Sequence, residues 1–225
     1  MKESPSVLCK NIQKNYGSGA TLVHALKDVD FKIYPGELTL LVGPSGSGKT
    51  TLLSIITGIL TPDDGEVFLL GQDMNAMSED KKAHFYALNL GIVFQSLYLI
   101  PTLTVVENVI LPLLIAGFSE KKATIKALDV LKDLKFSHRA TSMPSELSKG
   151  QQQRVAIARA IVNDAQILVC DEPTSALDHE TGILIMTLLQ ELAKKFLKTV
   201  LVVTHDHRIF SFADRIINIA DGQIE

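Results

Sequence analysis

The sequence predicts an α/β fold in which a mostly parallel sheet carries an N-terminal antiparallel β portion and an inserted helical lobe. Apolar and charged residues alternate over 28–33, as in a half-buried strand. Short apolar runs at 38–42, 167–170 and 200–203 are typical of strands that are buried on both faces. Residues 96–150 lack a convincing strand run and contain helical patterns. A chain of 225 residues fits one such domain.

The N-terminal half predicts two strands and a helix in sequence. The residues expected on the buried face of the first strand are Val29, Phe31 and Ile33. The turn Pro35-Gly36 separates that strand from the apolar run 38–42. A helix is then predicted from Lys49 to about Leu60, where the turn signal TPDDG follows.

The C-terminal half has the strand–helix–strand order of a parallel sheet, because a helical pattern separates the runs 167–170 and 200–203. The residues expected on the buried face of this crossover helix recur every four positions: Leu184, Leu188, Leu192 and Phe196. We expect about 1–95 and 151–225 to form the α/β core. About 96–150 is expected to form a helical subdomain.

Composition excludes several classes of protein. The longest apolar run, 109–118, is too short to span a bilayer, and residues 1–11 lack the apolar stretch of a secretion signal. The chain is therefore expected to be cytosolic, with any membrane partner supplied by another chain. The net charge is −3 and no basic block indicates nucleic acid. Cys9 and Cys170 give neither a disulfide framework nor zinc-ligand spacing.

A phosphate-binding loop is predicted at 43–50, where GPSGSGKT fits G-x-x-x-x-G-K-[ST] between a buried strand and a helix. Glycines let backbone N–H groups point at phosphates, and the helix N-terminus adds partial positive charge. Lys49 is expected to reach the β- and γ-phosphates, and the Thr50 hydroxyl to bind Mg²⁺. A plain glycine-rich turn is the alternative. The residues expected to bind nucleotide are Gly43, Pro44, Ser45, Gly46, Ser47, Gly48, Lys49, Thr50 and Thr51.

Two adjacent carboxylates, Asp171 and Glu172, follow the apolar run 167–170. They are expected at the carboxyl edge of the parallel sheet, where ligands bind. Asp171 is suited to hold Mg²⁺, directly or through water. Glu172 could polarise the water that attacks the γ-phosphate. A solvated loop position is the alternative, but two acids beside an apolar strand are costly without a cation or hydrogen bonds.

A second loop, LSKGQQQR at 147–154, precedes an apolar, Ala-rich run. A helix is expected to begin near Lys149, with its free N–H groups facing an anion. Ser148 can cap that helix or donate a hydrogen bond to the same anion. The sequence therefore predicts two anion-binding loops that lie far apart along the chain.

Four further motifs occur in a fixed order: GIVFQ ending at Gln95, LSKGQQQRVAIARA from Leu147, DEPTSALD at 171–178 and VTHD containing His205. With the loop at 43–50, they resemble the ATP-binding cassette of ABC transporters. The resemblance covers essentially the whole chain. It implies a P-loop NTPase core that hydrolyses ATP with Mg²⁺ and couples hydrolysis to transport.

The resemblance also implies residue roles. Gln95 contacts Mg²⁺ and the attacking water, Glu172 is the catalytic base, and His205 contacts the γ-phosphate. Tyr16 matches the aromatic position that stacks on adenine, although taken alone it would more often be a packing residue. His205 taken alone could be a core histidine. It could also form a metal pair with His207, but no further ligands have suitable spacing.

The resemblance further implies two copies that pair head to tail. Ser148, Gly150 and Gln151 of one copy then clamp the γ-phosphate held by the other, and Asp178 closes the loop that crosses between them. ATP favours the closed pair because it binds that state better. Lys149 stands where the family usually has Gly. Its Cβ would be strained if the position needed a positive φ, or its ammonium adds charge near the phosphate.

Several stretches resemble the LolD/MacB group, above all 15–33 and 93–113, and GKTTLL, DEPTSALD and THDHRIFSFADRI resemble the DevA type. This implies export of lipid-like, lipoprotein or drug substrates through a permease at the inner face of the membrane. Many LolD and MacB sequences read GNLD where this chain has SALD at 175–178, which disfavours lipoprotein release.

An apolar cluster after Gln95 is predicted to receive a coupling helix of the permease, with ordinary lobe packing as the alternative. Its residues are Leu97, Tyr98, Leu99 and Ile100. Other functions are a soluble ABC ATPase of DNA repair or translation, a cell-division cassette and an importer cassette. The soluble type usually carries coiled-coil insertions or a second fused cassette, which this sequence does not contain.

Overall fold

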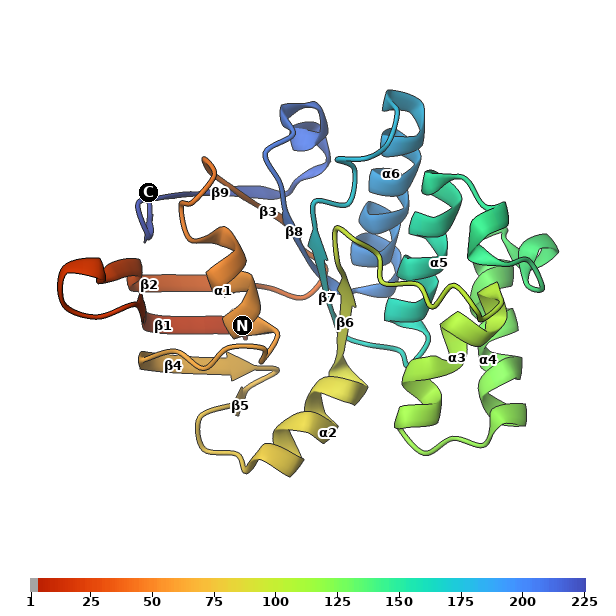
Figure 1. The fold of residues 1–225 in the computed structure, drawn as a ribbon, viewed down its shortest axis with the longest axis horizontal. Coiled ribbons are helices and arrows are strands. Elements are labelled where there is room, and N and C mark those ends of the chain that lie inside the picture. The colour runs from red at the N-terminus through yellow and green to blue at the C-terminus, as the bar shows by residue number, and fades with distance from the viewer. Residues whose placement is uncertain (1–3) are drawn as a thin grey trace.

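A computed structural model describes residues 4–225 and places two sheets side by side (Figure 1). The first is antiparallel and has the order β2-β1-β4-β5. Its strands are β1 (Val7–Tyr16), β2 (Val23–Ile33), β4 (Asp64–Leu69) and β5 (Gln72–Asp73). Val29, Phe31 and Ile33 are buried on its inner face, which confirms the alternation predicted there.

The second sheet has the order β10-β9-β3-β8-β7-β6, and every pair in it is parallel except the terminal hairpin of β9 and β10. The predicted α/β fold with a mostly parallel sheet is thereby confirmed. Its strands are β3 (Leu38–Val42), β6 (Leu90–Val93), β7 (Ile167–Asp171), β8 (Thr199–Val203), β9 (Arg215–Ala220) and β10 (Gln223–Ile224).

Six helices and four short 3₁₀ segments lie among the described residues. The helices are α1 (Lys49–Ile56), α2 (Glu79–Asn89), α3 (Val105–Ile115), α4 (Glu120–Asp133), α5 (Lys149–Ile161) and α6 (His179–Phe196). The 3₁₀ segments are η1 (Gly19–Thr21), η2 (Ser137–Arg139), η3 (Pro144–Glu146) and η4 (His207–Phe212). In the part of the chain that the structure describes, no helix is both long and apolar enough to cross a membrane.

Alternate residues of the central strands pack against different helices. Leu41 and Leu201 join a cluster with α1 and the antiparallel sheet. Leu40 and Leu168 join a cluster with α5 and α6. Side chains that alternate along a strand point to opposite faces of the sheet. Helix α1 therefore covers one face, and α5 and α6 cover the other (Figure 1).

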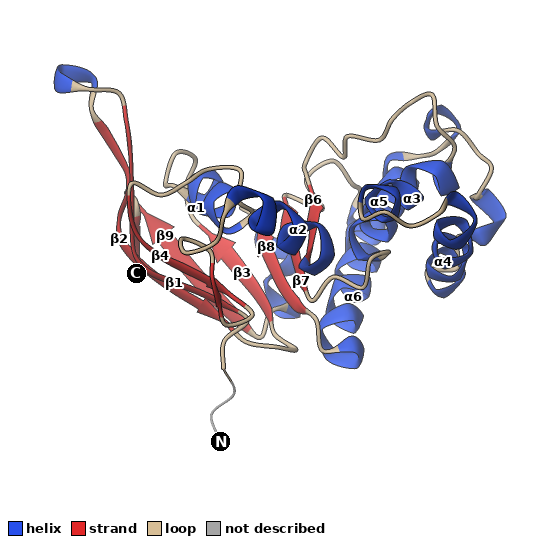
Figure 2. Cartoon of the chain, turned by 90° about the horizontal axis from the view of Figure 1, so that it is seen from below, coloured by secondary structure: helices blue, strands red, loops and turns tan. Residues whose placement is uncertain are grey.

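A third apolar cluster joins α3, α4 and the segment around Phe136 to α5. In Figures 1 and 2, α3 and α4 lie at the end of the molecule opposite β1, β2 and β4. Helix α5 contributes to this cluster and to the core cluster, so it joins the helical lobe to the parallel sheet. The residue boundaries between core and helical subdomain stay a prediction.

Two expectations about helices are wrong. Helix α1 ends at Ile56 rather than near Leu60. On α6, Leu184 and Phe196 are more than half exposed, and the buried stripe is Ile185, Met186, Leu189, Leu192 and Ala193. A helix turns about 100° per residue, so a spacing of four drifts about 40° at each step and leaves the buried face.

Candidate functional site

The loop at 43–50 joins the carboxyl end of β3 to the first turn of α1. Gly48 is the N-cap of α1 with φ 106°, and a Cβ there would lie 2.6 Å from the Ala25 carbonyl oxygen. A Cβ on Gly43 would lie 2.1 Å from the Ile219 carbonyl oxygen. No side chain of the described residues caps α1, so its first N–H groups are free for an anion.

The polar groups of this loop fit a bound phosphate chain. Lys49 Nζ donates to the carbonyl oxygens of Gly43 at 2.8 Å and Pro44 at 2.7 Å, so its charge lies over the loop. The Ser47 hydroxyl is buried and has no partner among residues 4–225. A buried polar group without a partner is rare, and a phosphate oxygen would supply that partner.

A hollow of about 380 Å³ adjoins the loop and is lined by its residues Gly46, Gly48, Lys49, Thr50 and Thr51, with Val23, His24, Ala25, Lys27, Asp221 and Gly222 opposite. The sequence analysis did not predict the residues of the opposite wall. Tyr16 pairs with Val23 across β1 and β2, and both side chains are exposed. Predicting this wall would have required the register of the strands, which residue spacing does not give.

Asp171 ends β7 and is half-buried. Burial raises the pKa of this carboxyl, the neighbouring Glu172 raises it further, and Lys49 lowers it. Burial lowers the pKa of Lys49, and the two carboxylates oppose that shift. These three charges therefore interact. A half-buried carboxylate of this kind is stabilised by a nearby cation.

The carboxylate of Glu172 is held on both oxygens. His205 Nδ1 lies 2.6 Å from Oε1, and the Thr204 hydroxyl donates to Oε2 at 3.3 Å. Glu172 adopts φ 49°, and its backbone N–H donates to the Val203 carbonyl at 2.9 Å. The turn after β7 thus aims this side chain at the residues that follow β8. His205 itself is exposed, with 71% of its side chain accessible to solvent.

Gln95 follows β6 and reaches the same turn through one serine. Its Nε2 lies 3.5 Å from the Ser175 hydroxyl, which donates to the Glu172 carbonyl oxygen at 3.0 Å. The structure therefore brings Gln95, Glu172 and His205 to neighbouring strand ends, as the parallel order β8-β7-β6 requires.

Helix α5 begins as predicted, directly after Ser148. Ser148 Oγ accepts from the Gln151 N–H at 3.3 Å, and the Gln151 side chain accepts from the Ser148 N–H at 3.0 Å, which forms a capping box. Lys149 is exposed in the first turn and is not among the residues with positive φ. The strain considered for its Cβ is therefore wrong, because a helical φ accommodates any side chain.

Gly150 packs directly against α6. A Cβ on Gly150 would lie 2.2 Å from Thr181 Cγ2. Asp178, the N-cap of α6, accepts from the Thr181 N–H at 2.9 Å and from its hydroxyl at 2.7 Å. These bonds hold the pKa of Asp178 below its usual range. The loop around Ser148 and the loop ending at Asp178 thus meet at one threonine.

The helices that follow the two predicted anion-binding loops, α1 and α5, pack on opposite faces of the parallel sheet. Lys149 and Gln153 share a small hollow of about 90 Å³ with Gln95 and Glu172. The described residues that line it include none from the loop at 43–50. The start of α5 therefore approaches the carboxylate turn of its own chain.

The residues of the apolar cluster after Gln95 differ in their exposure to solvent. Tyr98 is 65% exposed and Ile100 is 40% exposed, whereas Leu97 is 8% exposed and packs in the core. Including Leu97 in an exposed surface was therefore wrong. Leu97 and Tyr98 both adopt positive φ, at 58° and 45°.

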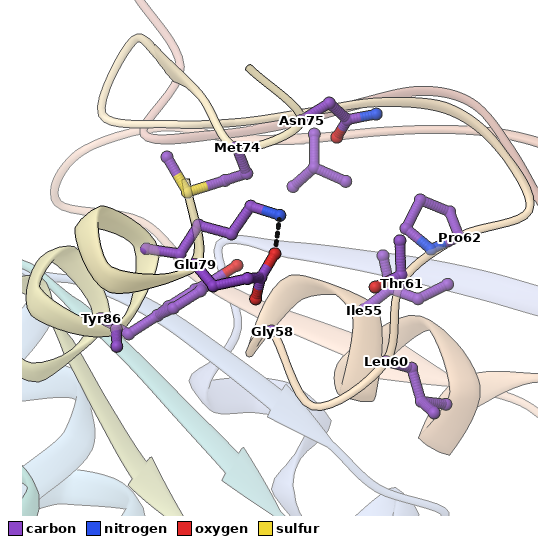
Figure 3. A pocket seen from close by; sticks show the side chains of 12 residues that line it. Ile55, Gly58, Leu60, Thr61, Pro62, Met74, Asn75, Glu79 and Tyr86 are labelled. Carbon is purple, nitrogen blue, oxygen red and sulfur yellow. Dashed lines mark hydrogen bonds and ion pairs between the residues drawn. The ribbon is translucent and has the colours of Figure 1, made fainter. Parts of the chain in front are cut away.

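A separate hollow of about 350 Å³ lies between α1, β4 and α2 (Figure 3). The Tyr86 ring leaves no room for a Cβ on Gly58, and Lys82 and Glu79, which both line the hollow, form an ion pair at 2.8 Å. Its lining shares no residue with the predicted nucleotide site.

The sequence of this chain is similar to those of known proteins. The family model for ABC transporter matches residues 26–175. The ABC transporter ATP-binding protein MJ0796 of Methanocaldococcus jannaschii is 44% identical over 96% of this chain and 94% of that protein. The lipoprotein-releasing system ATP-binding protein LolD of Francisella tularensis is 40% identical, with the same coverage of 96% and 94%.

Two further similarities concern assembly. The macrolide export ATP-binding/permease protein MacB of Pasteurella multocida is 40% identical over all of this chain, which spans 34% of that protein. A dimeric, post-hydrolysis structure of the MJ0796 cassette bound to ADP and Pi matches with a TM-score of 0.88 and 43% identity. That match covers 97% of this chain and 96% of the other.

Proposed function

The chain belongs to the ABC transporter family as an ATP-hydrolysing nucleotide-binding subunit, and we propose that it powers a separate membrane permease that exports lipid-like, lipoprotein or drug substrates. The observation that carries the proposal is its similarity to LolD over nearly its whole length. MacB joins an ATP-binding part and a permease in one chain, and this chain matches about a third of it. A separate permease would supply the remainder and hold this subunit at the inner face of the membrane.

In the proposed site, residues 43–51 bind the phosphates of ATP and Tyr16 stacks on adenine. The oxygens of Thr50, Gln95 and Asp171 would hold Mg²⁺, which would supply positive charge to the phosphate oxygens. Lys49 adds a second positive charge from within the loop. The buried, unpartnered hydroxyl of Ser47 supports this assignment.

In the proposed reaction, Glu172 accepts the proton of the water that attacks the γ-phosphate. Its contacts with His205 and Thr204 fix the direction of the carboxylate. The His205 side chain is exposed to solvent and is free to contact the γ-phosphate. Gln95 orients the water and senses whether the phosphate is present.

The proposed reaction centre is shared by two copies. Ser148, Gly150 and Gln151 of one copy contact the γ-phosphate held by the other, and Asp178 places the loop between them. The packing of α1 and α5 on opposite faces of the sheet supports this arrangement. The dimeric MJ0796 structure supports it as well.

Gly150→Ala is expected to lower ATP turnover about tenfold, because the added methyl group clashes with Thr181 Cγ2 and shifts the start of α5. Thr181→Ser removes that methyl group and keeps the hydroxyl that donates to Asp178. The double variant should recover most of the loss in a steady-state ATPase assay. If Thr181→Ser leaves the Gly150→Ala defect unchanged, this contact does not set the geometry of the loop.

Tyr98→Asp is expected to abolish transport while basal ATPase activity stays within about twofold of wild type, because Tyr98 is an exposed residue outside the nucleotide site. The proposed contact with the permease is apolar, and a buried carboxylate without a partner weakens it strongly. Recovery of the tagged subunit with solubilised membranes measures the contact. Leu128→Asp, which is exposed on α4, is the matched control. Lost ATP binding in Tyr98→Asp would contradict the assignment.

A further inference from the structure

A small hollow of about 90 Å³ lies beside Glu172, where the segment after β6, the start of α5 and the turn after β7 meet. One water molecule takes up about 30 Å³ in the liquid, so the hollow has room for more than one. Among the described residues, none of the predicted nucleotide loop 43–51 lines it. The polar residues that line it are Gln95, Ser96, Lys149, Gln153, Glu172 and Ser175.

Gln153 has a side-chain amide whose hydrogen bonding is incomplete. The residue is only 4% exposed, and its Nε2 is buried and has no hydrogen-bond partner within residues 4–225. A buried donor without a partner is costly, and native structures usually satisfy such a group with an ordered water or an ion. Because Gln153 also lines the hollow, a molecule bound there would complete the hydrogen bonding of this amide.

The charges around the hollow favour a neutral ligand. Lys149 contributes one positive charge and Glu172 one negative charge, and the other described lining residues are uncharged. A free oxyanion would be repelled by the carboxylate, and a free cation by the ammonium. Water both donates and accepts hydrogen bonds, so it suits a lining of amides, hydroxyls and one charge of each sign.

Two further lining residues have capacity for a bound water. Each carboxylate oxygen of Glu172 has one contact, with His205 Nδ1 or with the Thr204 hydroxyl, whereas a carboxylate offers about four lone-pair sites. Gln95 Nε2 lies 3.5 Å from the Ser175 hydroxyl, which is long for a hydrogen bond. With Gln153, these residues provide the roughly three polar partners that a buried water usually has.

We propose that this hollow is a water site beside the proposed base and that Gln153 is its positioning residue. Water held by Gln153 and Gln95 hydrates the Glu172 carboxylate and replaces the molecule that each turnover consumes. The hollow lies within one chain, so the supply does not require the two copies to separate. This inference rests on the proposed function, and in it Gln153 contacts the water rather than ATP.

Gln153→Met keeps the length of the side chain and removes the amide. Its kcat for ATP hydrolysis should fall at least about tenfold, the equivalent of one lost hydrogen bond, while KM for ATP stays within about twofold of wild type. Gln153→Ser leaves a shorter polar side chain with room for a further water, so its kcat should fall less than that of Gln153→Met. A residue that only packs α5 against the core would show the reverse order, because methionine fills the space and serine does not.

Thermal unfolding separates hydration from packing. Gln153→Met removes an amide nitrogen that no described protein group binds, so its Tm should stay within about 3 °C of wild type. Gln190→Met is the matched control, since Gln190 Nε2 on α6 donates to the Phe212 carbonyl oxygen at 3.0 Å. This control should lower Tm and keep kcat within about twofold of wild type. A Gln153→Met chain that is more stable and equally active would overturn the inference, because it would have lost a costly unpartnered group from a dry hollow.

A crystal structure of the Glu172→Gln dimer with ATP and Mg²⁺ tests for the water itself. An ordered water should lie in the hollow within about 3.2 Å of the Gln153 amide, and it should be lost when Gln153→Met is added. A dry hollow, or an oxyanion or a side chain of the partner copy in its place, would overturn the inference. Near-normal hydrolysis by Glu172→Gln overturns the proposed reaction. An inactive Glu172→Gln together with wild-type kcat in Gln153→Met overturns this inference alone.

Discussion

Glu172→Gln is expected to bind ATP as tightly as the wild-type chain while kcat falls at least about 100-fold, because an amide cannot take the proton of the attacking water. The substitution keeps the shape of the side chain. The amide can still accept from Thr204 and meet His205, so the turn after β7 should keep its geometry. ATP then remains intact at the shared site, and the closed dimer should accumulate.

Steady-state phosphate release measures the loss of turnover, and size-exclusion chromatography with ATP and Mg²⁺ measures the dimer. Glu180→Gln is the matched control, since that carboxylate is exposed in the first turn of α6. It should retain turnover within about twofold of wild type. Near-normal hydrolysis in Glu172→Gln would remove Glu172 from the role of base.

Residue spacing predicted the elements whose signals come from residues that are close together in the sequence. The strand Leu38–Val42 was expected as a short apolar run and has those bounds, because a strand that is buried on both faces favours apolar residues at most positions. The start of α5 after Ser148 was also predicted, since a capping serine precedes the helical run. These signals lie within a few residues of one another along the chain.

The features missed from sequence depend on contacts between distant segments. The buried face of α6 depends on how that helix rotates against β3 and β8, which a spacing of four residues does not define. Leu97 is buried, and Arg159, 62 residues further along, holds its carbonyl oxygen. The contact of Gly150 with Thr181 likewise joins two loops that only the fold brings together.

The shared reaction centre predicts that two inactive chains restore activity when mixed. Lys49→Ala removes the charge in the phosphate-binding loop, and Ser148→Arg blocks the facing loop with a bulky side chain. Each variant alone damages both sites of its dimer. In a mixed dimer both defects fall on one site, and the second site combines an intact loop from each chain.

The control is a mixture of Lys49→Ala with Glu172→Gln. Lys49 and Glu172 belong to the same half-site, because the phosphate-binding loop and the carboxylate turn follow neighbouring strands of the same sheet, so each site of a mixed dimer then carries one defect. No combination of these two chains gives an intact site. This mixture should therefore remain inactive.

The most direct measurement is ATP turnover in an equimolar mixture of Lys49→Ala and Ser148→Arg chains. Random pairing makes about half of the dimers mixed, each with one intact site, so about a quarter of wild-type turnover should return. Recovery should rise with total protein concentration. Turnover that stays at the level of the separate variants, while the wild type works equally well as a monomer, would contradict a centre shared between two copies.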